Sequence, residues 1–208
     1  MIPRGAVFLD RDVVINRNVL DRATGEYGAP LLPEDFELAP GAIDALLALQ
    51  QAGFPLFLIS NQPNYAKGKS SLEDLAAVHQ RMTAELEAAG IAFAEFYYCY
   101  HHPKGVVADY SGPCECRKPS PYFLFKARDA FGLALQDSWI VGDRATDIEC
   151  GRAAGVRPTR VKEDHPLTRA ANEAKADFEA YDLAHAAEII LKFSVAACER
   201  NDERTRRT

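Results

Sequence analysis

The sequence predicts a single α/β domain with a mostly parallel sheet. Short apolar segments alternate along the chain with longer segments whose apolar residues recur at helical spacing. The short segments are largely continuous in apolar residues, which is typical of strands covered by helices on both faces of a parallel sheet. Polar residues directly follow three of these segments, at the edge where such sheets bind their ligands.

Length and composition agree with this fold class. The chain has 208 residues, of which 48% are hydrophobic and 26% are charged, as in an ordinary soluble domain with a sizeable core. The formal charge of −6 argues against general affinity for nucleic acid or for an anionic membrane. No run approaches the roughly 18 apolar residues of a membrane span, and no secretory signal precedes the first strand. We therefore expect a cytoplasmic protein.

The first half of the chain contains three expected strands and two expected helices. The strands cover residues 6–9, 54–59 and 93–98, and the helices cover residues 42–52 and 71–89. In the second helix an apolar stripe runs from Leu72 to Leu86 at helical spacing. Each helix is followed by a glycine, Gly53 or Gly90, which is a common way for a helix to end.

The second half continues the alternation. We expect helices over 121–131 and 182–197 and strands over 138–141 and 156–161. Between the two strands, Thr146 and Glu149 have the spacing of a capping box, and Gly155 ends the helix that they would begin. The domain is expected to cover residues 1–198, and the charged tail 199–208 is expected to fray. Two long segments without periodicity, 16–40 and 99–120, are expected to be functional or held by a ligand.

Polar residues cluster where three expected strands end. Asp10 and Asp12 follow the first strand, Ser60 and Asn61 the second, and Asp143 the fourth. One such aspartate alone would most simply cap a turn. Several carboxylates together repel one another unless a cation offsets their charge, and oxygen ligands without imidazole suit Mg²⁺. The sequence therefore predicts a magnesium site at this edge of the sheet.

Four short segments carry a family resemblance. Residues 8–12, 59–62, 117–119 and 142–147 resemble, in order, the four motifs of the haloacid dehalogenase (HAD) superfamily of phosphatases. The match runs from residue 6 to about residue 161 and places each motif at the expected strand end or loop. The resemblance implies a three-layer, Rossmann-like HAD core without a separate cap domain.

The resemblance also implies a mechanism. Asp10 would attack phosphorus and form an aspartyl-phosphate, and Asp12 would protonate the leaving oxygen and later activate water. Mg²⁺ would be held by Asp10, by the backbone carbonyl of Asp12 and by Asp143. Lys118 would neutralise negative charge on Asp10 and on the phosphoryl group.

Further roles follow from the same resemblance. Ser60 and Asn61 would donate hydrogen bonds to the transferring group, and Arg117 would contact a second phosphate of the substrate. Asp147 would cap a helix or support the metal shell rather than bind the metal. The implied partner is a small phosphorylated molecule, with neither nucleic acid nor membrane, and we expect a monomer.

The cysteines indicate a second metal. Cys99 and His101 precede Cys114 and Cys116 by twelve intervening residues, and three thiolates with one imidazole form a closed tetrahedral set for a structural Zn²⁺. The alternatives are three unrelated buried cysteines, or His102 in place of His101. Outside this segment, Cys150 and Cys198 lie on expected helices and are interpreted as buried apolar residues.

The cysteine-containing segment narrows the resemblance to one branch of the superfamily. It is similar to the heptose 1,7-bisphosphate phosphatase family, whose relatives include histidinol-phosphate phosphatases. The leading hypothesis is a Mg²⁺-dependent phosphatase of a small sugar phosphate; the alternatives are a histidinol-phosphate phosphatase and a catalytically silent phosphate-binding protein. Three features depart from the family pattern: Val13 in place of glycine, Pro63, and the sequence of residues 17–33. A positive φ at Val13 would be strained.

Overall fold

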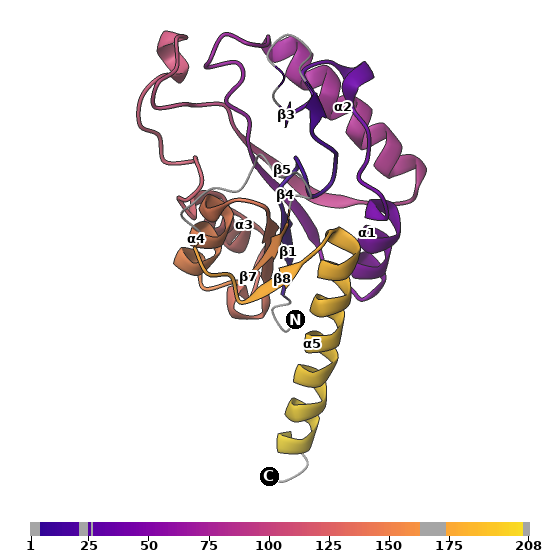
Figure 1. Cartoon of the computed structure of the whole chain (residues 1–208). Coiled ribbons are helices and arrows are strands. Elements are labelled where there is room, and N and C mark those ends of the chain that lie inside the picture. The colour runs from indigo at the N-terminus through magenta and orange to yellow at the C-terminus, as the bar shows by residue number, and fades with distance from the viewer. Residues whose placement is uncertain (1–4, 21–24, 26, 163–173, 206–208) are drawn as a thin grey trace.

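A six-stranded sheet forms the centre of the protein (Figure 1). The computed structural model describes residues 5–20, 25, 27–162 and 174–205, and only the backbone of residues 195–205. The strand order is β5-β4-β1-β6-β7-β8, and every neighbouring pair among these strands is parallel. The strands are β1 (Val7–Leu9), β4 (Leu56–Asn61), β5 (Phe93–Cys99), β6 (Trp139–Gly142), β7 (Arg157–Val161) and β8 (Phe178–Ala180).

Helices cover both faces of the sheet, as Figure 1 shows. One side carries α1 (Ala42–Gln51), α2 (Leu72–Ala88) and α5 (Leu183–Thr205), and the other carries α3 (Tyr122–Phe131) and α4 (Ala145–Ala154). Side chains of β1 and of the residue before it alternate between the two faces: Val7 and Leu9 join the core beneath α1, α2 and α5, whereas Ala6 and Phe8 join the core beneath α3 and α4. This explains why the central strand is apolar at every position.

The predicted fold class is confirmed, with local differences. The capping box predicted at Thr146 and Glu149 is wrong, because α4 already begins at Ala145 and Asp147 accepts the backbone N–H of Arg144. The last helix is longer than expected and continues to Thr205. Strand β8 was not predicted, since its three residues include an exposed glutamate and form the edge of the sheet.

The two long aperiodic segments contain short elements. The first holds an antiparallel pair, β2 (Val19–Leu20) and β3 (Tyr27–Gly28), followed by the 3-10 turn η1 (Pro33–Asp35). The second holds the 3-10 turn η2 (Ala108–Tyr110), and another turn, η3 (Leu135–Asp137), precedes β6. Both long segments leave the sheet at its carboxyl edge, beyond Asp10 and Cys99. They are therefore placed to build a site there.

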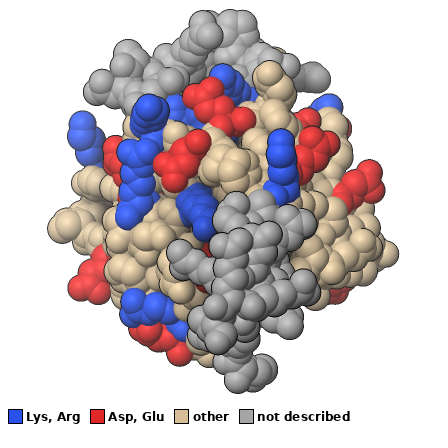
Figure 2. Space-filling view, turned by 90° about the horizontal axis from the view of Figure 1, so that it is seen from below, with Lys and Arg blue, Asp and Glu red and all other residues tan. Residues whose placement is uncertain are grey.

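The opposite end of the molecule carries a mixed surface. Seen from below the view of Figure 1, Lys and Arg side chains alternate with Asp and Glu side chains (Figure 2). This mixture gives no single-sign field on that face to attract a polyanion. Among the described helices, none combines the length and the apolar composition that a membrane span requires.

The packing of α4 against the sheet depends on Gly151. A Cβ atom built there would lie 2.3 Å from Cγ2 of Ile140, so the helix approaches β6 more closely than an alanine allows. We expect Gly151→Ala to lower the free energy of unfolding by about 1–3 kcal/mol, the usual cost of overpacking a core. Urea denaturation measures this change. The control is Ala153→Ser on the exposed face of α4; equal stability of the two variants would contradict the close packing.

Candidate active site

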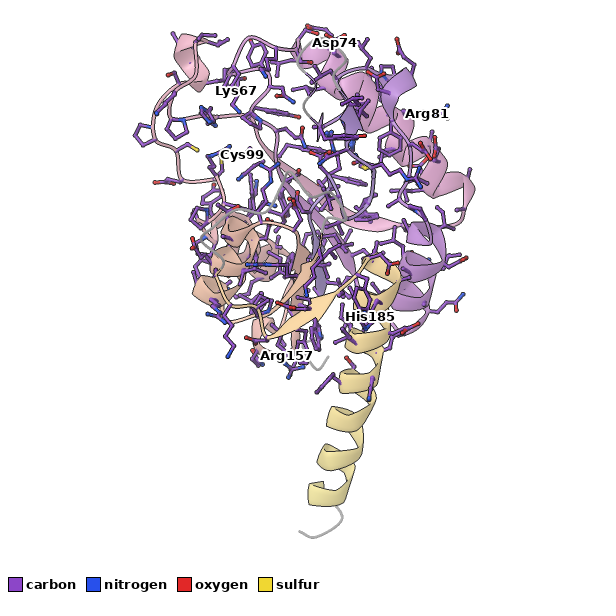
Figure 3. The ribbon with its side chains drawn as sticks, viewed as in Figure 1. Lys67, Asp74, Arg81, Cys99, Arg157 and His185 are labelled. Atoms are coloured by element: carbon purple, nitrogen blue, oxygen red, sulfur yellow. The ribbon has the colours of Figure 1, made fainter. Side chains whose placement is uncertain are left out.

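The strand order brings the predicted polar residues together. The chain runs outward from β1 to β4 and β5, then returns to the other side of β1 with β6 and β7. Such a reversal leaves a crevice at the carboxyl ends of the central strands. Asp10 follows β1, Ser60 and Asn61 end β4, and Asp143 follows β6. In Figure 3 the labelled Lys67 and Cys99 lie at this upper end, and Arg157 lies at the lower end.

Asp10 is buried and held at both oxygens. Its Oδ1 accepts the backbone N–H of Arg11 at 2.7 Å, and its Oδ2 lies 3.1 Å from Nζ of Lys118. Burial raises the pKa of Asp10, the Lys118 charge opposes that rise, and the carboxylates of Asp147 and Asp12 add to it. The carboxylate is therefore fixed in one orientation in a site that disfavours further negative charge.

Lys118 occupies the centre of the site. Its ammonium group contacts Asp147 Oδ1 at 2.5 Å and Asp10 Oδ2 at 3.1 Å, and it donates to the Ile59 carbonyl at 2.7 Å. These three contacts match the three protons of an ammonium group. Burial works against the charged form, but Asp10 and Asp147 raise the pKa of Lys118 above its usual range. Asn61 fixes the backbone of Lys118 by one hydrogen bond in each direction, both 3.1 Å long.

Three carboxylates form an acidic group next to Lys118. One oxygen each of Asp10, Asp143 and Asp147 lies within 4.8 Å of the others. Burial, followed by the charges of Asp10 and Asp147, raises the pKa of Asp143 well above its ordinary value. Asp147 uses Oδ1 for Lys118 and Oδ2 for the N–H of Arg144, so its geometry is that of a supporting residue. Each carboxylate oxygen has two lone pairs, so Asp10 retains lone pairs beside its two contacts, and these together with Asp143 offer the oxygen ligands that a hard cation requires.

Asp12 is held by a separate network. Arg11 donates from Nε to Asp12 Oδ1 at 3.0 Å, with Nη2 2.9 Å from the same oxygen. Asn16 donates to Oδ1 at 3.2 Å, and Gln62 donates to Oδ2 at 2.7 Å. Burial alone would raise the pKa of Asp12, but the Arg11 charge and the hydrogen bonds from Gln62, Arg11 and Asn16 lower it. The sequence did not reveal these three partners, although the position of Arg11 between two aspartates was a signal.

A strained turn presents Asp12. Val13 has a φ of 71°, which is the left-handed conformation that favours glycine. Valine stands here where the family pattern has glycine, so the sequence had indicated strain at this position. Backbone hydrogen bonds enforce the turn, because Val13 N–H donates to Asn16 C=O and Ile15 N–H donates to Arg11 C=O. A β-branched residue here costs about 1–3 kcal/mol, which the surrounding contacts must offset.

The remaining residues predicted to contact substrate have protein partners as well. Ser60 is buried and accepts a hydrogen bond from Gln62 at 3.1 Å. Asn61 holds Lys118, as described above. Arg117 donates from Nη1 to the carbonyl of His101 at 3.0 Å, which connects the residue before Lys118 to the cysteine-containing segment. Each of the three side chains therefore also stabilises the arrangement of the site through a contact with the protein itself.

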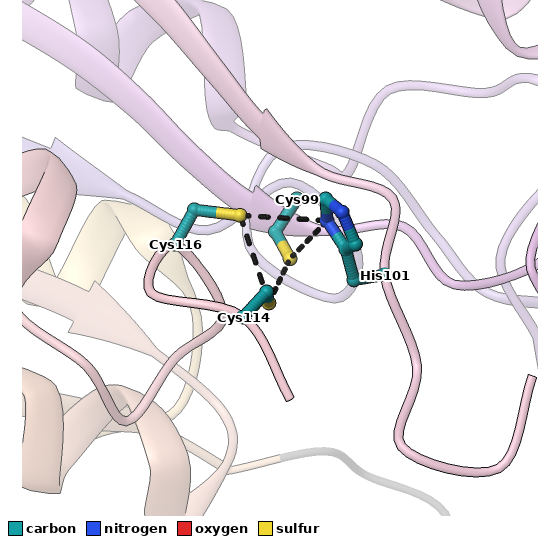
Figure 4. A group of neighbouring side chains, drawn as sticks. All are labelled: Cys99, His101, Cys114 and Cys116. Atoms are coloured by element: carbon teal, nitrogen blue, oxygen red, sulfur yellow. Dashed lines mark hydrogen bonds between the residues drawn. The ribbon is translucent and has the colours of Figure 1, made fainter. Parts of the chain in front are cut away.

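The four predicted zinc ligands converge (Figure 4). Cys99 Sγ lies 3.6 Å from Cys114 Sγ and 4.0 Å from His101 Nδ1, and Cys116 Sγ lies 3.8 Å from Cys114 Sγ and 3.7 Å from His101 Nδ1. A tetrahedron with metal–sulfur arms of about 2.3 Å has edges of about 3.8 Å. The rival His102 faces elsewhere, since its Nδ1 accepts the N–H of Lys104.

The other two cysteines were interpreted as apolar residues of helices. Cys150 is completely buried on α4, in the core beneath α3 and α4, and its Sγ donates to the carbonyl of Ser120 at 3.2 Å. Cys198 belongs to α5, but its side chain lies outside the described residues.

A cavity of about 560 Å³ opens beside Asp12. One wall comes from the β2–β3 hairpin and the chain after it, with Val19, Leu20, Tyr27, Leu31 and Leu32. The chain after β4 contributes further lining residues, among them Lys67 and Lys69, and the cavity is also lined by Arg144 and by Asp35 and Asp74. Burial, then the charges of Lys69, Arg117 and Arg144, lower the pKa of Lys67. Lys67 therefore lies near several other positive charges.

Comparison with known proteins agrees with the geometry. A family model described as HAD-hydrolase-like matches residues 115–186. The D-glycero-beta-D-manno-heptose-1,7-bisphosphate 7-phosphatase of Yersinia pestis is 34% identical over 180 residues, which cover 86% of this chain and 91% of that protein. The enzyme of the same name from Vibrio cholerae is 38% identical over 151 residues, 73% of this chain and 77% of its own. This chain belongs to the heptose-bisphosphate phosphatase family of HAD hydrolases.

Solved structures of two related phosphatases have the same fold over most of this chain. The D,D-heptose 1,7-bisphosphate phosphatase from B. bronchiseptica, crystallised with magnesium and phosphate, superposes with a TM-score of 0.74 at 26% identity, over 90% of this chain and 98% of its own. A HAD-like phosphatase from Mesorhizobium loti gives a TM-score of 0.76 at 27% identity, over 93% of this chain and 87% of its own. The relatives at 34–38% identity are HAD phosphatases. This chain is therefore an enzyme that hydrolyses phosphate esters.

The network around Asp12 makes a pH prediction. Because the folded state lowers the pKa of Asp12 below its unfolded value of about 4, the stability that it adds is complete above that pH. This stability is lost as the pH falls through the lower folded value. We expect Gln62→Leu to raise the pKa of Asp12 and to reduce this acid-dependent part of the stability. A ¹³C NMR titration of the Asp12 carboxyl group without added metal measures the shift.

The matched control is Gln51→Leu, an exposed glutamine at the end of α1. It should leave the Asp12 titration unchanged. An Asp12 pKa that is the same in Gln62→Leu as in the parent protein would show that the hydrogen bond at Oδ2 does not stabilise the carboxylate.

Proposed function

We propose that this chain is a Mg²⁺-dependent phosphatase that removes one phosphate of a sugar bisphosphate, D-glycero-β-D-manno-heptose 1,7-bisphosphate, through an aspartyl-phosphate at Asp10. The observation that carries the proposal is the arrangement of Asp10, Lys118 and Asp143 near Asp12, which itself lines a cavity together with Lys67, Lys69 and Arg144. The relatives named for this reaction at 34–38% identity support the choice of substrate.

Asp10 is the proposed nucleophile. Its fixed carboxylate attacks phosphorus, the new Asp10–phosphorus bond forms, and the bond to the leaving oxygen breaks. The amide of Arg11 and the ammonium of Lys118 hold the attacking carboxylate in place, so little reorganisation is needed during the attack. Ser60 and Asn61, at the end of the neighbouring strand, are the proposed donors to the transferring group.

Asp12 is the proposed proton carrier. Its Oδ1 accepts from Arg11 and Asn16, whereas Oδ2 accepts, among the described residues, only from Gln62, so Oδ2 is the oxygen better able to exchange a proton. The neighbouring phosphate dianion of a bound substrate raises the pKa of Asp12 and favours the acid that protonates the leaving oxygen. The resulting carboxylate then takes a proton from the water that cleaves the Asp10–phosphorus bond and releases inorganic phosphate.

The acidic group fits Mg²⁺. Asp10 and Asp143 supply carboxylate oxygens with unused lone pairs within reach of one another, and burial with mutual repulsion raises the pKa of both groups in the absence of a cation. Together with the backbone carbonyl of Asp12, these oxygens would hold the ion. When bound, Mg²⁺ offsets the negative charge that the carboxylates and the phosphoryl oxygens share.

The cysteine cluster fits a structural Zn²⁺. Cys99, His101, Cys114 and Cys116 fill all four corners of a tetrahedron, which leaves no position for water or substrate. The cluster ends two residues before Lys118, and Arg117 donates to the backbone of His101. Its proposed role is therefore to fix the segment that delivers Lys118.

The cavity suggests how the rest of the substrate binds. Lys67 and Lys69 line the cavity. The positive charges of Arg117 and Arg144 contribute to the lowered pKa of Lys67. A second phosphate of the substrate would relieve this concentration of positive charge. We therefore assign the second phosphate chiefly to the two lysines, with Arg117 in support, rather than to Arg117 alone as the sequence suggested.

Turnover on two substrates tests the proposed function. Purified protein with Mg²⁺ should hydrolyse heptose 1,7-bisphosphate with a much higher kcat/KM than histidinol phosphate, and Asp10→Asn should abolish both activities because an amide is a poor nucleophile. Release of inorganic phosphate is the measurement. Preference for histidinol phosphate would reassign the substrate, and absence of hydrolysis of any phosphate monoester would favour a silent binding protein.

The two lysines that line the cavity make a separate prediction. Lys67→Gln and Lys69→Gln should each raise KM for the bisphosphate roughly tenfold or more, since each removes a charged contact. KM for p-nitrophenyl phosphate, which lacks a second phosphate, should not change. Lys192→Gln, on the exposed face of α5, is the control for a lost charge. An equal rise in KM for both substrates would exclude a subsite for the second phosphate.

The zinc proposal is tested by metal analysis. Freshly purified protein should carry about one Zn²⁺ per chain, and Cys114→Ser should lose it and lower the melting temperature, because metal binding contributes folding energy to this segment. Cys150→Ala, a cysteine outside the cluster, should retain full zinc content. Mild chelation should stop activity reversibly by removing Mg²⁺ first. Parent protein without zinc would refute the assignment of these four ligands.

A further inference from the structure

The turn that carries Lys67 and Lys69 is attached to the cysteine-containing segment. The turn covers residues 63–69, and backbone hydrogen bonds of 2.8–3.0 Å from the N–H groups of Lys67, Gly68 and Lys69 close it. Both lysines line the cavity and are exposed, whereas Ala66 is fully buried and does not line it. Because the lysine side chains are exposed, the backbone of the turn sets where their ammonium groups can reach.

Backbone contacts make the first part of this attachment. The carbonyl oxygen of Ala66 accepts hydrogen bonds from the N–H groups of Val106, at 2.6 Å, and Val107, at 3.2 Å. Gly105 lies against the same residue, since a Cβ atom built on Gly105 would lie 3.0 Å from the Ala66 oxygen and 3.2 Å from the Ala66 Cβ atom. The turn after β4 and the chain before η2 are therefore in close backbone contact, and they run side by side in Figure 1.

Aromatic contacts make the second part. The ring of Tyr65, in the turn, packs edge to face against the ring of Tyr110, the last residue of η2, with ring centroids 4.9 Å apart. The Tyr110 ring also packs against the imidazole of His101, with 5.3 Å between centroids. The backbone of Tyr110 is fixed as well, because its carbonyl accepts the N–H of His102 and its N–H donates to the carbonyl of Val107, both at 3.0 Å. Tyr110 is thus held by its own segment and contacts the turn through its ring.

The ring contact restrains the turn in a way that the backbone contacts do not. Both hydrogen bonds from the neighbouring segment end on one oxygen atom of Ala66, so they act as a pivot. An edge-to-face pair favours one relative orientation of its two rings, and the contact at Tyr65 therefore limits rotation about that pivot. Tyr65 and Tyr110 are half-buried and do not line the cavity, so a molecule bound there would meet the lysines and not the tyrosines.

We propose that Tyr110 is a positioning residue for substrate binding: through its contact with Tyr65 it holds the turn so that Lys67 and Lys69 reach the second phosphate. The proposal rests on the proposed function, which assigns that phosphate to the two lysines. Without the Tyr110 ring, the turn keeps its internal hydrogen bonds but rotates more freely about Ala66. Binding of the bisphosphate is then weakened, whereas the proposed catalytic residues, which belong to other segments, keep their arrangement.

The test compares a substrate that has two phosphates with one that has a single phosphate. We expect Tyr110→Ala to raise KM for the bisphosphate about fivefold, in line with the usual contribution of one aromatic pair, and to change kcat less than about twofold. KM for p-nitrophenyl phosphate should change less than about twofold, because this substrate makes no use of the second subsite. Tyr65→Ala should have the same effect, and the double variant should lose no more than either single variant.

Further variants separate positioning from general packing. Tyr110→Phe keeps the ring and should retain the parent KM. Tyr181→Ala is the control for a lost tyrosine ring, since Tyr181 stacks on His185 and does not line the cavity. In a protein with glutamine at both lysine positions, 67 and 69, Tyr110→Ala should raise KM no further, because it acts through these lysines. An equal rise in KM for both substrates, a raised KM in Tyr110→Phe, or a further rise without the lysines would overturn the proposal.

A second measurement does not depend on turnover. Amide hydrogen exchange at Val106 and at residues 67–69 reports how firmly the turn is held, because each of these amides donates a hydrogen bond within the turn or to it. Exchange there should be at least about threefold faster in Tyr110→Ala and unchanged in Tyr181→Ala. Unchanged exchange in Tyr110→Ala would overturn the proposal even in an active enzyme. If the parent protein hydrolysed no phosphate monoester, the proposed function would fail, and faster exchange would still support the role of Tyr110 in holding the turn.

Discussion

The ammonium group of Lys118, held between Asp10 and Asp147, is the interaction on which the active site depends. It places one positive charge among three carboxylates that would otherwise repel one another in a buried crevice. Removing one partner of such a pair leaves an uncompensated buried charge, which is far more costly than replacing the whole pair. The pair also ties the loop before α3 to the ends of β1 and to α4, so the three parts of the site are fixed relative to one another.

The position of Lys118 is secured by contacts on both sides of the chain. Asn61 at the end of β4 binds its backbone, and the cysteine cluster holds the chain two residues earlier. Arg117, between these two anchors, donates to the carbonyl of His101. A metal in the cluster would therefore act on catalysis only through the placement of Lys118, which is why we assign it a structural role.

The central strands and helices could be predicted because their buried positions are occupied by apolar residues. A strand such as β1 packs against helices on both faces, so every residue of it must be apolar, and the polar residue that follows marks the strand end. The proposed zinc ligands and the proposed catalytic residues Asp10, Asp12, Lys118 and Asp143 could be named because the chemistry assigned to them requires particular residue types in a particular order.

Other features could not be predicted because they arise from tertiary contacts. Strand β8 and the β2–β3 hairpin are too short to show a periodicity, and α4 begins at Ala145 because Asp147 caps it, which overrides the spacing of Thr146 and Glu149. The partners of Asp12 come from residues 11, 16 and 62. Apart from the position of Arg11 between two aspartates, the local sequence of these residues does not show which partner each of them binds.

The central claim is that Asp10 carries the phosphoryl group during turnover. Borohydride added during hydrolysis of the bisphosphate reduces an aspartyl-phosphate to homoserine, and mass spectrometry of the digested protein locates the change. The account predicts reduction at Asp10 and at no other aspartate, dependent on substrate and on Mg²⁺. Continued turnover with Asp10 unmodified, or with the modification at another carboxylate, would contradict it.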